Sequence, residues 1–155
     1  GGSIYSRFGF SDVLTMFLAL NASVELYKGG VVPLAEYAQR PYDRDILVRV
    51  LVPKENARFV YQSVRNSQTD FPVLTCAAAK LADGSIRAAI GARPGKAVLY
   101  TAAPEAGETA EEFAARFAAE VKADIKTESN LRGGAEYRRH LAGVLTKRAV
   151  CRLEG

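Results

Sequence analysis

Hydrophobic residues in the first third of the chain change from helical to strand-like spacing. Four apolar side chains within 13–18 fall on one helix face, and Ser11 and Asp12 before them suit an N-cap and the positive end of the helix dipole. From Asp45 to Val52, apolar residues at alternate positions predict a strand that Pro53 ends. Two shorter elements are also predicted, a strand over 22–26 and a helix over 34–38.

A polar segment, residues 53–56, separates this region from a second run of predicted strands and helices. Strands are expected over 59–65, 71–81 and 85–91, with a shorter fourth over 96–100. Thr109 and Glu112 form a capping box at the start of a helix whose apolar residues repeat every four positions. A last helix is expected after Gly133-Gly134, with one face made of Tyr137, Leu141, Val144, Leu145 and Arg148.

This order of elements predicts the fold class. Several strands followed by two helices are typical of an α+β fold, here an antiparallel sheet of three or four strands packed against helices, and not of a doubly wound sheet. We expect two domains, residues 1–55 and residues 57–155, with the boundary in the polar segment. The first residue is Gly1 and not methionine, so we expect the chain to be processed or to be part of a longer polypeptide.

Composition and charge narrow the possible partners and location. The net charge of +4 is mild, and the basic residues of the last predicted helix alternate with apolar ones, so we expect no nucleic-acid partner. The longest apolar stretch, 13–20, is too short to span a membrane, so no membrane partner is expected. Cys76 and Cys151 lie far apart in the sequence and are interpreted as reduced thiols of a cytoplasmic protein.

The sequence contains little self-sufficient catalytic chemistry. With His140 as the single histidine, a Ser/His/Asp or Cys/His relay is not expected, and two cysteines are too few for an iron–sulfur cluster. No Walker-type phosphate loop is present. The segment 91–96 has the composition of an anion-binding loop, but we interpret it as a plain turn after a strand. We therefore expect no catalytic competence in this chain alone, and a cofactor or partner would supply the chemistry.

Two longer stretches resemble a known family. The first contains Gly1-Gly2-Ser3-Ile4, Ser11-Asp12 and Phe17-Leu18-Ala19-Leu20-Asn21-Ala22, similar to the segment G-G-N-[IL]…S-D…L-L-A-L-x-A. The second runs from Arg132-Gly133-Gly134-Ala135-Glu136-Tyr137 to Arg148-Ala149, similar to R-G-S-A-E-Y-R-R-x-L-A-x-V-L-x-x-R-A. Both are found in the flavin subunits of the xanthine dehydrogenase and carbon monoxide dehydrogenase family of molybdenum hydroxylases. Between them, Thr69-Asp70-Phe71-Pro72-Val73 resembles the family's A-x-D-[FI]-[PA]-x-V strand entry.

The resemblance implies a place in a larger flavoprotein. Residues 1–55 would be the end of the second FAD-binding subdomain, and residues 57–155 a carboxy-terminal domain of the carbon monoxide dehydrogenase flavoprotein type. The amino-terminal subdomain with the pyrophosphate loop has no counterpart here, so the FAD site would be incomplete. Electrons would pass from the molybdenum cofactor and iron–sulfur clusters of a large and a small partner subunit to FAD and then to an acceptor.

The resemblance also indicates which residues could line the FAD site. They combine close backbone approach, hydroxyl groups, a carboxylate and apolar packing, and are Gly1, Gly2, Ser3, Ser6, Ser11, Asp12, Leu47 and Val48. Three departures bear on flavin affinity: Ser3 replaces a usual asparagine, Gly9 a frequent proline, and Gln62 a lysine that reaches toward the flavin in relatives. Two alternatives stay open: Gly1-Gly2-Ser3 is also a common linker, and the chain could be a flavin-free domain that serves structure and subunit assembly.

Overall fold

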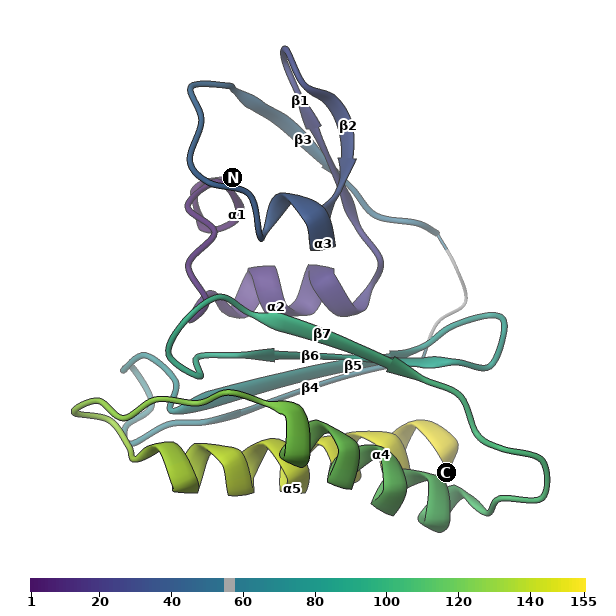
Figure 1. Ribbon diagram of the computed structural model, residues 1–155. Coiled ribbons are helices and arrows are strands. Elements are labelled where there is room, and N and C mark those ends of the chain that lie inside the picture. Colours follow the sequence, from purple (N-terminus) through teal and green to yellow (C-terminus); the bar gives the residue numbers. More distant parts are fainter. Residues whose placement is uncertain (55–57) are drawn as a thin grey trace.

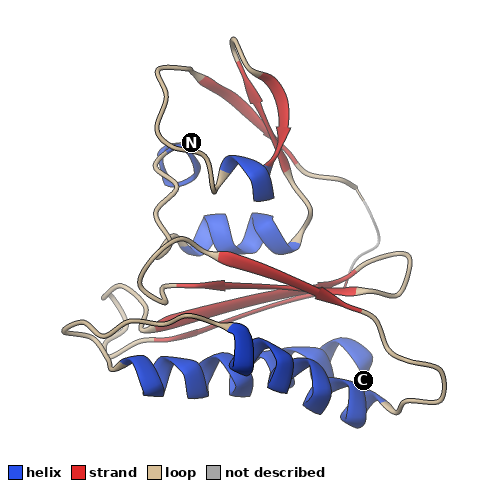
Figure 2. Cartoon of the chain, viewed as in Figure 1, coloured by secondary structure: helices blue, strands red, loops and turns tan. Residues whose placement is uncertain are grey.

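The computed structural model describes residues 1–54 and 58–155, which form three stacked layers (Figure 1). Two long helices lie on one face of a four-stranded sheet, and on the opposite face lie a helix and a small second sheet (Figure 2). The expected α+β fold, with an antiparallel four-stranded sheet packed against helices, is therefore confirmed. The expected domain boundary at 55–57 lies outside the described residues.

The region 1–54, called the N-terminal unit below, is built from short elements. Its helices are α1 (Gly2–Tyr5), α2 (Asp12–Ala19) and α3 (Leu34–Tyr37), and its strands are β1 (Ser23–Leu26), β2 (Gly30–Pro33) and β3 (Leu47–Leu51). The strand order is β2-β1-β3, with antiparallel pairing throughout. Ser11 caps α2 as expected, because its Oγ accepts from the Leu14 amide.

Two elements of the N-terminal unit were not predicted, α1 and β2. The hairpin that includes β2 is closed from a distance, since the Asp45 carboxylate accepts from the amides of Lys28 and Gly29. These hydrogen bonds lower the pKa of Asp45, and the bond from the Lys28 amide has the largest effect. The sequence around residues 28–30 shows only a glycine pair, whereas the hairpin also depends on a residue far along the chain.

The region 58–155, called the C-terminal unit below, contains the four-stranded meander. Its strands are β4 (Arg58–Val64), β5 (Leu74–Lys80), β6 (Ile86–Gly91) and β7 (Val98–Ala102), in the order β4-β5-β6-β7. They are followed by α4 (Ala110–Asp124) and α5 (Ala135–Glu154). The predicted capping box is present, since Thr109 Oγ1 accepts from the Glu112 amide and the Glu112 carboxylate accepts from the Thr109 amide.

The sheet carries different side chains on its two faces. On β5, Leu74, Cys76 and Ala78 pack against α4 and α5, whereas Ala77 and Ala79 face α2. Small residues on the second face let α2 approach the sheet closely. At Gly91 the approach is closest, because a Cβ atom there would lie 2.4 Å from Thr15 Oγ1 and 2.5 Å from Thr75 Oγ1.

Helix α5 turns a different face to the sheet from the one predicted. Leu141 and Leu145 are buried as expected, but the Tyr137 side chain is 49% exposed and Arg148 is also exposed. Arg138, which is not part of the predicted inward face, is fully buried. The contact face is rotated by about one residue from the predicted one. Arg138 lies on this face because its guanidinium donates hydrogen bonds to the Val73 and Gly133 carbonyls.

The remaining sequence expectations concern cysteines and membrane spans. Cys76 and Cys151 are both free; Cys76 lies in the core and Cys151 on the surface. Burial raises the pKa of the Cys76 thiol to about 12. Among the described residues, no helix has the length and apolar character needed to cross a membrane.

Candidate functional site

Three adjoining cavities open around the first twelve residues of the chain. The serine cavity, of about 340 Å³, is lined by Gly2, Ser3, Ser6, Phe8, Phe10, Ser11, Asp12, Val13 and Phe71. The strand cavity, of about 450 Å³, is lined by Gly1, Gly2, Tyr5, Asp45, Ile46 and Leu47. The aromatic cavity, of about 550 Å³, lies behind a wall that it shares with the serine cavity, made of Phe8, Phe10 and Phe71.

The structure brings together most of the residues expected to line a flavin site. Five of them share the serine cavity: Gly2, Ser3, Ser6, Ser11 and Asp12. Gly1, Gly2 and Leu47 line the strand cavity, so Gly2 connects the two. Val48 is half-exposed and lines neither cavity, since side chains alternate along β3.

The Asp12 carboxylate is held firmly by the C-terminal unit. Oδ1 accepts from the Tyr61 hydroxyl at 2.5 Å, and Oδ2 accepts from Arg65 Nη2 at 2.6 Å. Burial, and then the bond to Asp12, raise the pKa of Tyr61 above its ordinary value. Each carboxylate oxygen has two acceptor sites, so Asp12 can still accept one further hydrogen bond at each oxygen from a group in the serine cavity.

The two glycines at the start of α1 leave open space beside the backbone. A Cβ atom built on Gly1 or Gly2 would meet no heavy atom of the chain within 4 Å. Internal packing therefore does not require glycine at either position. The hydroxyls of Ser3 and Ser6 line the same cavity and make no side-chain hydrogen bond to the described residues. Open glycine backbone beside free hydroxyls fits the polar ribitol and phosphate groups of a dinucleotide such as FAD.

Gln62 points away from these cavities. Its Nε2 donates to the Leu145 carbonyl of α5, on the opposite face of the sheet. A lysine at this position is expected in relatives to reach the flavin, but the glutamine here contacts the helical layer.

Arg7 is a central residue of this region that the sequence did not single out. Its side chain is buried, and its guanidinium carbon lies 4.3 Å from the Tyr37 ring centroid and 4.9 Å from that of Tyr42. Nη1 donates to the Pro41 carbonyl at 2.6 Å and Nε to the Tyr5 carbonyl. This cage folds residues 37–42 against α1. No local pattern marks a buried arginine, because its partners lie some thirty residues away.

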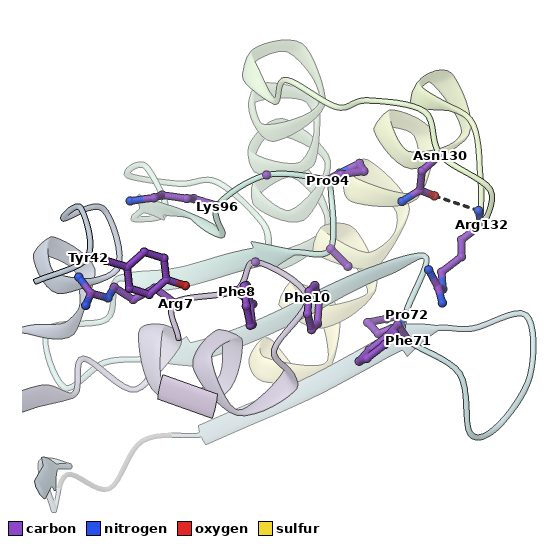
Figure 3. Close-up of a pocket in the computed structure, with 13 residues that line it drawn as sticks. Arg7, Phe8, Phe10, Tyr42, Phe71, Pro72, Pro94, Lys96, Asn130 and Arg132 are labelled. Atoms are coloured by element: carbon purple, nitrogen blue, oxygen red, sulfur yellow. Dashed lines mark hydrogen bonds between the residues drawn. The ribbon is translucent and has the colours of Figure 1, made fainter. Parts of the chain in front are cut away.

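A second group of residues lines the aromatic cavity (Figure 3), and of these the sequence indicated only those in the segment 91–96 as a candidate anion site. The Phe8 and Phe10 rings stack with centroids 5.1 Å apart, and Phe71 lies 4.7 Å from Phe10 at a tilt of 55°. Three cationic residues also line the cavity: Arg7, Lys96 and Arg132. A usable sequence signal was the pair of phenylalanines on either side of Gly9, in a loop where apolar rings have no periodic role.

Comparison with protein families gives one match. The model described as the CO dehydrogenase flavoprotein C-terminal domain matches residues 59–153, which include the whole four-stranded sheet except its first residue, together with most of both long helices. No curated protein sequence matches the chain significantly.

Solved structures share the fold over the entire chain. Quinoline 2-oxidoreductase from Pseudomonas putida 86 superposes with a TM-score of 0.81 at 20% identity, covering 99% of this chain and 59% of that one. Carbon monoxide dehydrogenase from Hydrogenophaga pseudoflava superposes with a TM-score of 0.81 at 23% sequence identity, and the coverage of both chains is the same. Reconstituted CO dehydrogenase from Oligotropha carboxidovorans superposes with a TM-score of 0.78 at 22% sequence identity, covering 99% of this chain and 60% of that one. The chain thus spans about three fifths of the length of these structures.

Proposed function

The chain belongs to the CO dehydrogenase flavoprotein C-terminal domain family, and from this we propose that it is part of the FAD-binding subunit of a molybdenum hydroxylase. In this role it lines one side of the flavin site on the route from molybdenum and iron–sulfur centres to an electron acceptor. The observation that carries the proposal is the shared serine cavity. Five of the eight residues that the family resemblance assigns to flavin contact lie around it.

The residues of the two cavities would hold FAD in complementary ways. The open backbone at Gly1 and Gly2 would let phosphate or ribitol approach closely, and Ser3 and Ser6 would supply hydroxyl groups. Leu47 would pack on an aromatic ring system. FAD, when bound, supplies the electron-carrying chemistry that no side chain can provide.

Asp12 would be the orienting carboxylate of this site. Because Tyr61 and Arg65 fix both of its oxygens, it would present its remaining acceptor positions in one direction. Both partners belong to β4 or its C-terminal flank, so the C-terminal unit would position a group that contacts FAD. This is how a domain that lies outside the main flavin-binding fold would contribute to the site.

Flavin binding by the complete subunit, compared with this 155-residue chain, tests the proposal. We expect the complete subunit to purify with FAD, and the isolated chain to bind FAD more weakly than micromolar. In the complete subunit, Gly2→Val should lower the flavin content at least about tenfold, because a Cβ at this position enters open space beside the described residues, where ligand atoms would lie. Gly134→Val, also at a glycine with open space beside it, is the matched control.

Two results would contradict the proposal. One is equal flavin content in the Gly2→Val and Gly134→Val proteins, measured by absorbance per protein. The other is a complete subunit without flavin, which would favour the alternative of a flavin-free domain for structure and subunit assembly. We further propose that the partners are a molybdenum-binding large subunit and an iron–sulfur small subunit, in the cytoplasm.

A further inference from the structure

The aromatic cavity has the size and shape of a small-ligand site. Its volume of about 550 Å³ lies within the usual range for such sites, roughly 300–1,000 Å³. Four separate segments form it, namely 7–10, 71–72, 92–96 and 130–132, together with Tyr42. Figure 3 shows the Phe8, Phe10 and Phe71 rings in a row along one side, with Lys96 and Arg132 at opposite ends.

The phenylalanine rings of the cavity are the most exposed phenylalanines among the described residues. The exposed fractions of Phe8, Phe10 and Phe71 are 50%, 40% and 53%, whereas Phe113 and Phe117 in the helical layer are almost fully buried. Exposed phenylalanine rings are unfavourable in water, and a flat ring that stacks on them would remove that cost. The row of rings therefore favours a planar aromatic ligand over a compact polar one.

The charges of the cavity favour an anionic ligand. Arg7, Lys96 and Arg132 line it, and none of the described residues around it contributes a carboxylate. Asp70 engages Nε and Nη2 of Arg132, which leaves Nη1 available to a ligand. A carboxylate suits a guanidinium edge, since charge-assisted hydrogen bonds of this kind are stronger than neutral ones.

The backbone around the cavity is fixed, so the site does not have to form on binding. The Ala92 amide donates to the Gly9 carbonyl at 2.6 Å, and a Cβ on Gly9 would lie only 1.7 Å from the Gly95 carbonyl oxygen. On the other side, the buried Arg138 donates to Asn130 Oδ1 at 2.6 Å. Preformed walls of this kind reduce the entropy lost when a ligand binds.

We propose that the aromatic cavity binds a planar aromatic carboxylate of one or two rings. The rings would stack on Phe8, Phe10 and Phe71, and the carboxylate would accept from Arg132 Nη1. The Lys96 ammonium donates to the Gln39 and Arg40 carbonyls, so it would contribute its one remaining N–H and its charge. This site is independent of the proposed flavin role, because it needs neither FAD nor a partner subunit.

Titration of the flavin-free chain with 2-naphthoate, followed by calorimetry and by ¹H–¹⁵N NMR, tests the proposal. We expect saturable binding, with shifts concentrated at Gly95, Lys96 and the Asn130 side-chain amide. The neutral isostere 2-naphthamide and the non-planar cyclohexanecarboxylate should each bind at least about tenfold more weakly, since one lacks the charge and the other lacks the aromatic face.

Matched variants locate the site without relying on the ligands alone. Phe10→Leu should weaken 2-naphthoate binding about fivefold or more, and Phe59→Leu, at a partly exposed phenylalanine on β4, should not. Equal binding of naphthoate and naphthamide, or NMR shifts outside the cavity, would overturn the proposal. Displacement of naphthoate by FAD would also overturn it, because the cavity would then be a flavin subsite.

Discussion

The two faces of the four-stranded sheet differ in how completely their partners bury aromatic rings. On the helical face, Phe113 and Phe117 stack with centroids 5.9 Å apart and are closed off from solvent. On the N-terminal side, Phe8 stacks on Phe10 and Phe71 packs against Phe10 at a tilt, but all three rings remain about half-exposed. The first group serves the stability of the fold, and the second is available to a ligand.

The two sides of the sheet also differ in how they satisfy a buried arginine. Arg138 donates from Nε to the Val73 carbonyl and from Nη1 to the Glu128 and Gly133 carbonyls, and lies in the helical layer. Arg7 lies among tyrosine rings, and its Nη2 makes no hydrogen bond, with the nearest Asp43 oxygen at 3.9 Å. Both arginines are buried, but only Arg138 on the helical side has an oxygen acceptor for each of its three guanidinium nitrogens.

The largest expected effect concerns the aromatic rings. Phe113→Ala should lower the free energy of unfolding by about 3–5 kcal/mol, because it removes a fully buried ring and leaves a cavity. Phe10→Ala should cost about 1 kcal/mol or less, since that ring is already 40% exposed. Urea unfolding of both variants measures the difference, and similar losses would contradict the contrast between the two faces.

The next effect concerns the buried arginine of α5. Arg138→Ala should lower the free energy of unfolding by about 3 kcal/mol, because several buried backbone carbonyls lose their donor. The neighbouring Arg139 is exposed and makes no hydrogen bond with the described residues. Arg139→Ala should therefore change the free energy of unfolding by less than about 0.5 kcal/mol. If thermal unfolding shows the two variants to be equally stable, the assigned role of Arg138 is wrong.

A smaller effect is expected where the two units meet. Gly91→Ala should cost about 1–3 kcal/mol, because its Cβ would overlap the hydroxyls of Thr15 and Thr75 between α2 and the sheet. Gly2→Ala, with open space beside it, is the control and should be nearly neutral. A Gly91→Ala protein with an unchanged melting temperature would mean that α2 does not approach the sheet as closely as described.

The smallest effect is a pH dependence confined to the C-terminal unit. Hydrogen bonds from Arg116, and then from the Glu105 amide, lower the pKa of Glu108 to about 2. A lowered folded-state pKa gives stability that is present above pH 4.5 and is lost as the pH falls toward 2. Glu108→Gln should therefore reduce the loss of stability over this range. Glu111→Gln, which removes no hydrogen bond among the described residues, should leave the pH profile unchanged.

Local patterns in the chain predicted the longer elements and indicated the family. The Thr109–Glu112 capping box, the strand alternation of the meander and the motif ending at Arg148-Ala149 all depend on residues close together in the chain. Such signals persist in any tertiary context, and they were enough to predict an α+β fold with an antiparallel sheet of three or four strands. The family resemblance named Ser3, Ser6 and Asp12 as candidates for flavin contact, and the fold places them around one cavity.

The side chains that meet across the layers could not be predicted from local patterns, because their partners lie far apart in the chain. Asp12 meets Tyr61 across 49 positions of the chain, and the hairpin before β2 is closed by Asp45. The buried face of α5 follows Arg138, and the exposed rings of Phe8 and Phe71 come together from separate loops. Helical and strand periodicity specify how an element is oriented about its own axis only to within about one residue. Hydrogen bonds between distant segments, which depend on how the layers stack, settle the rest.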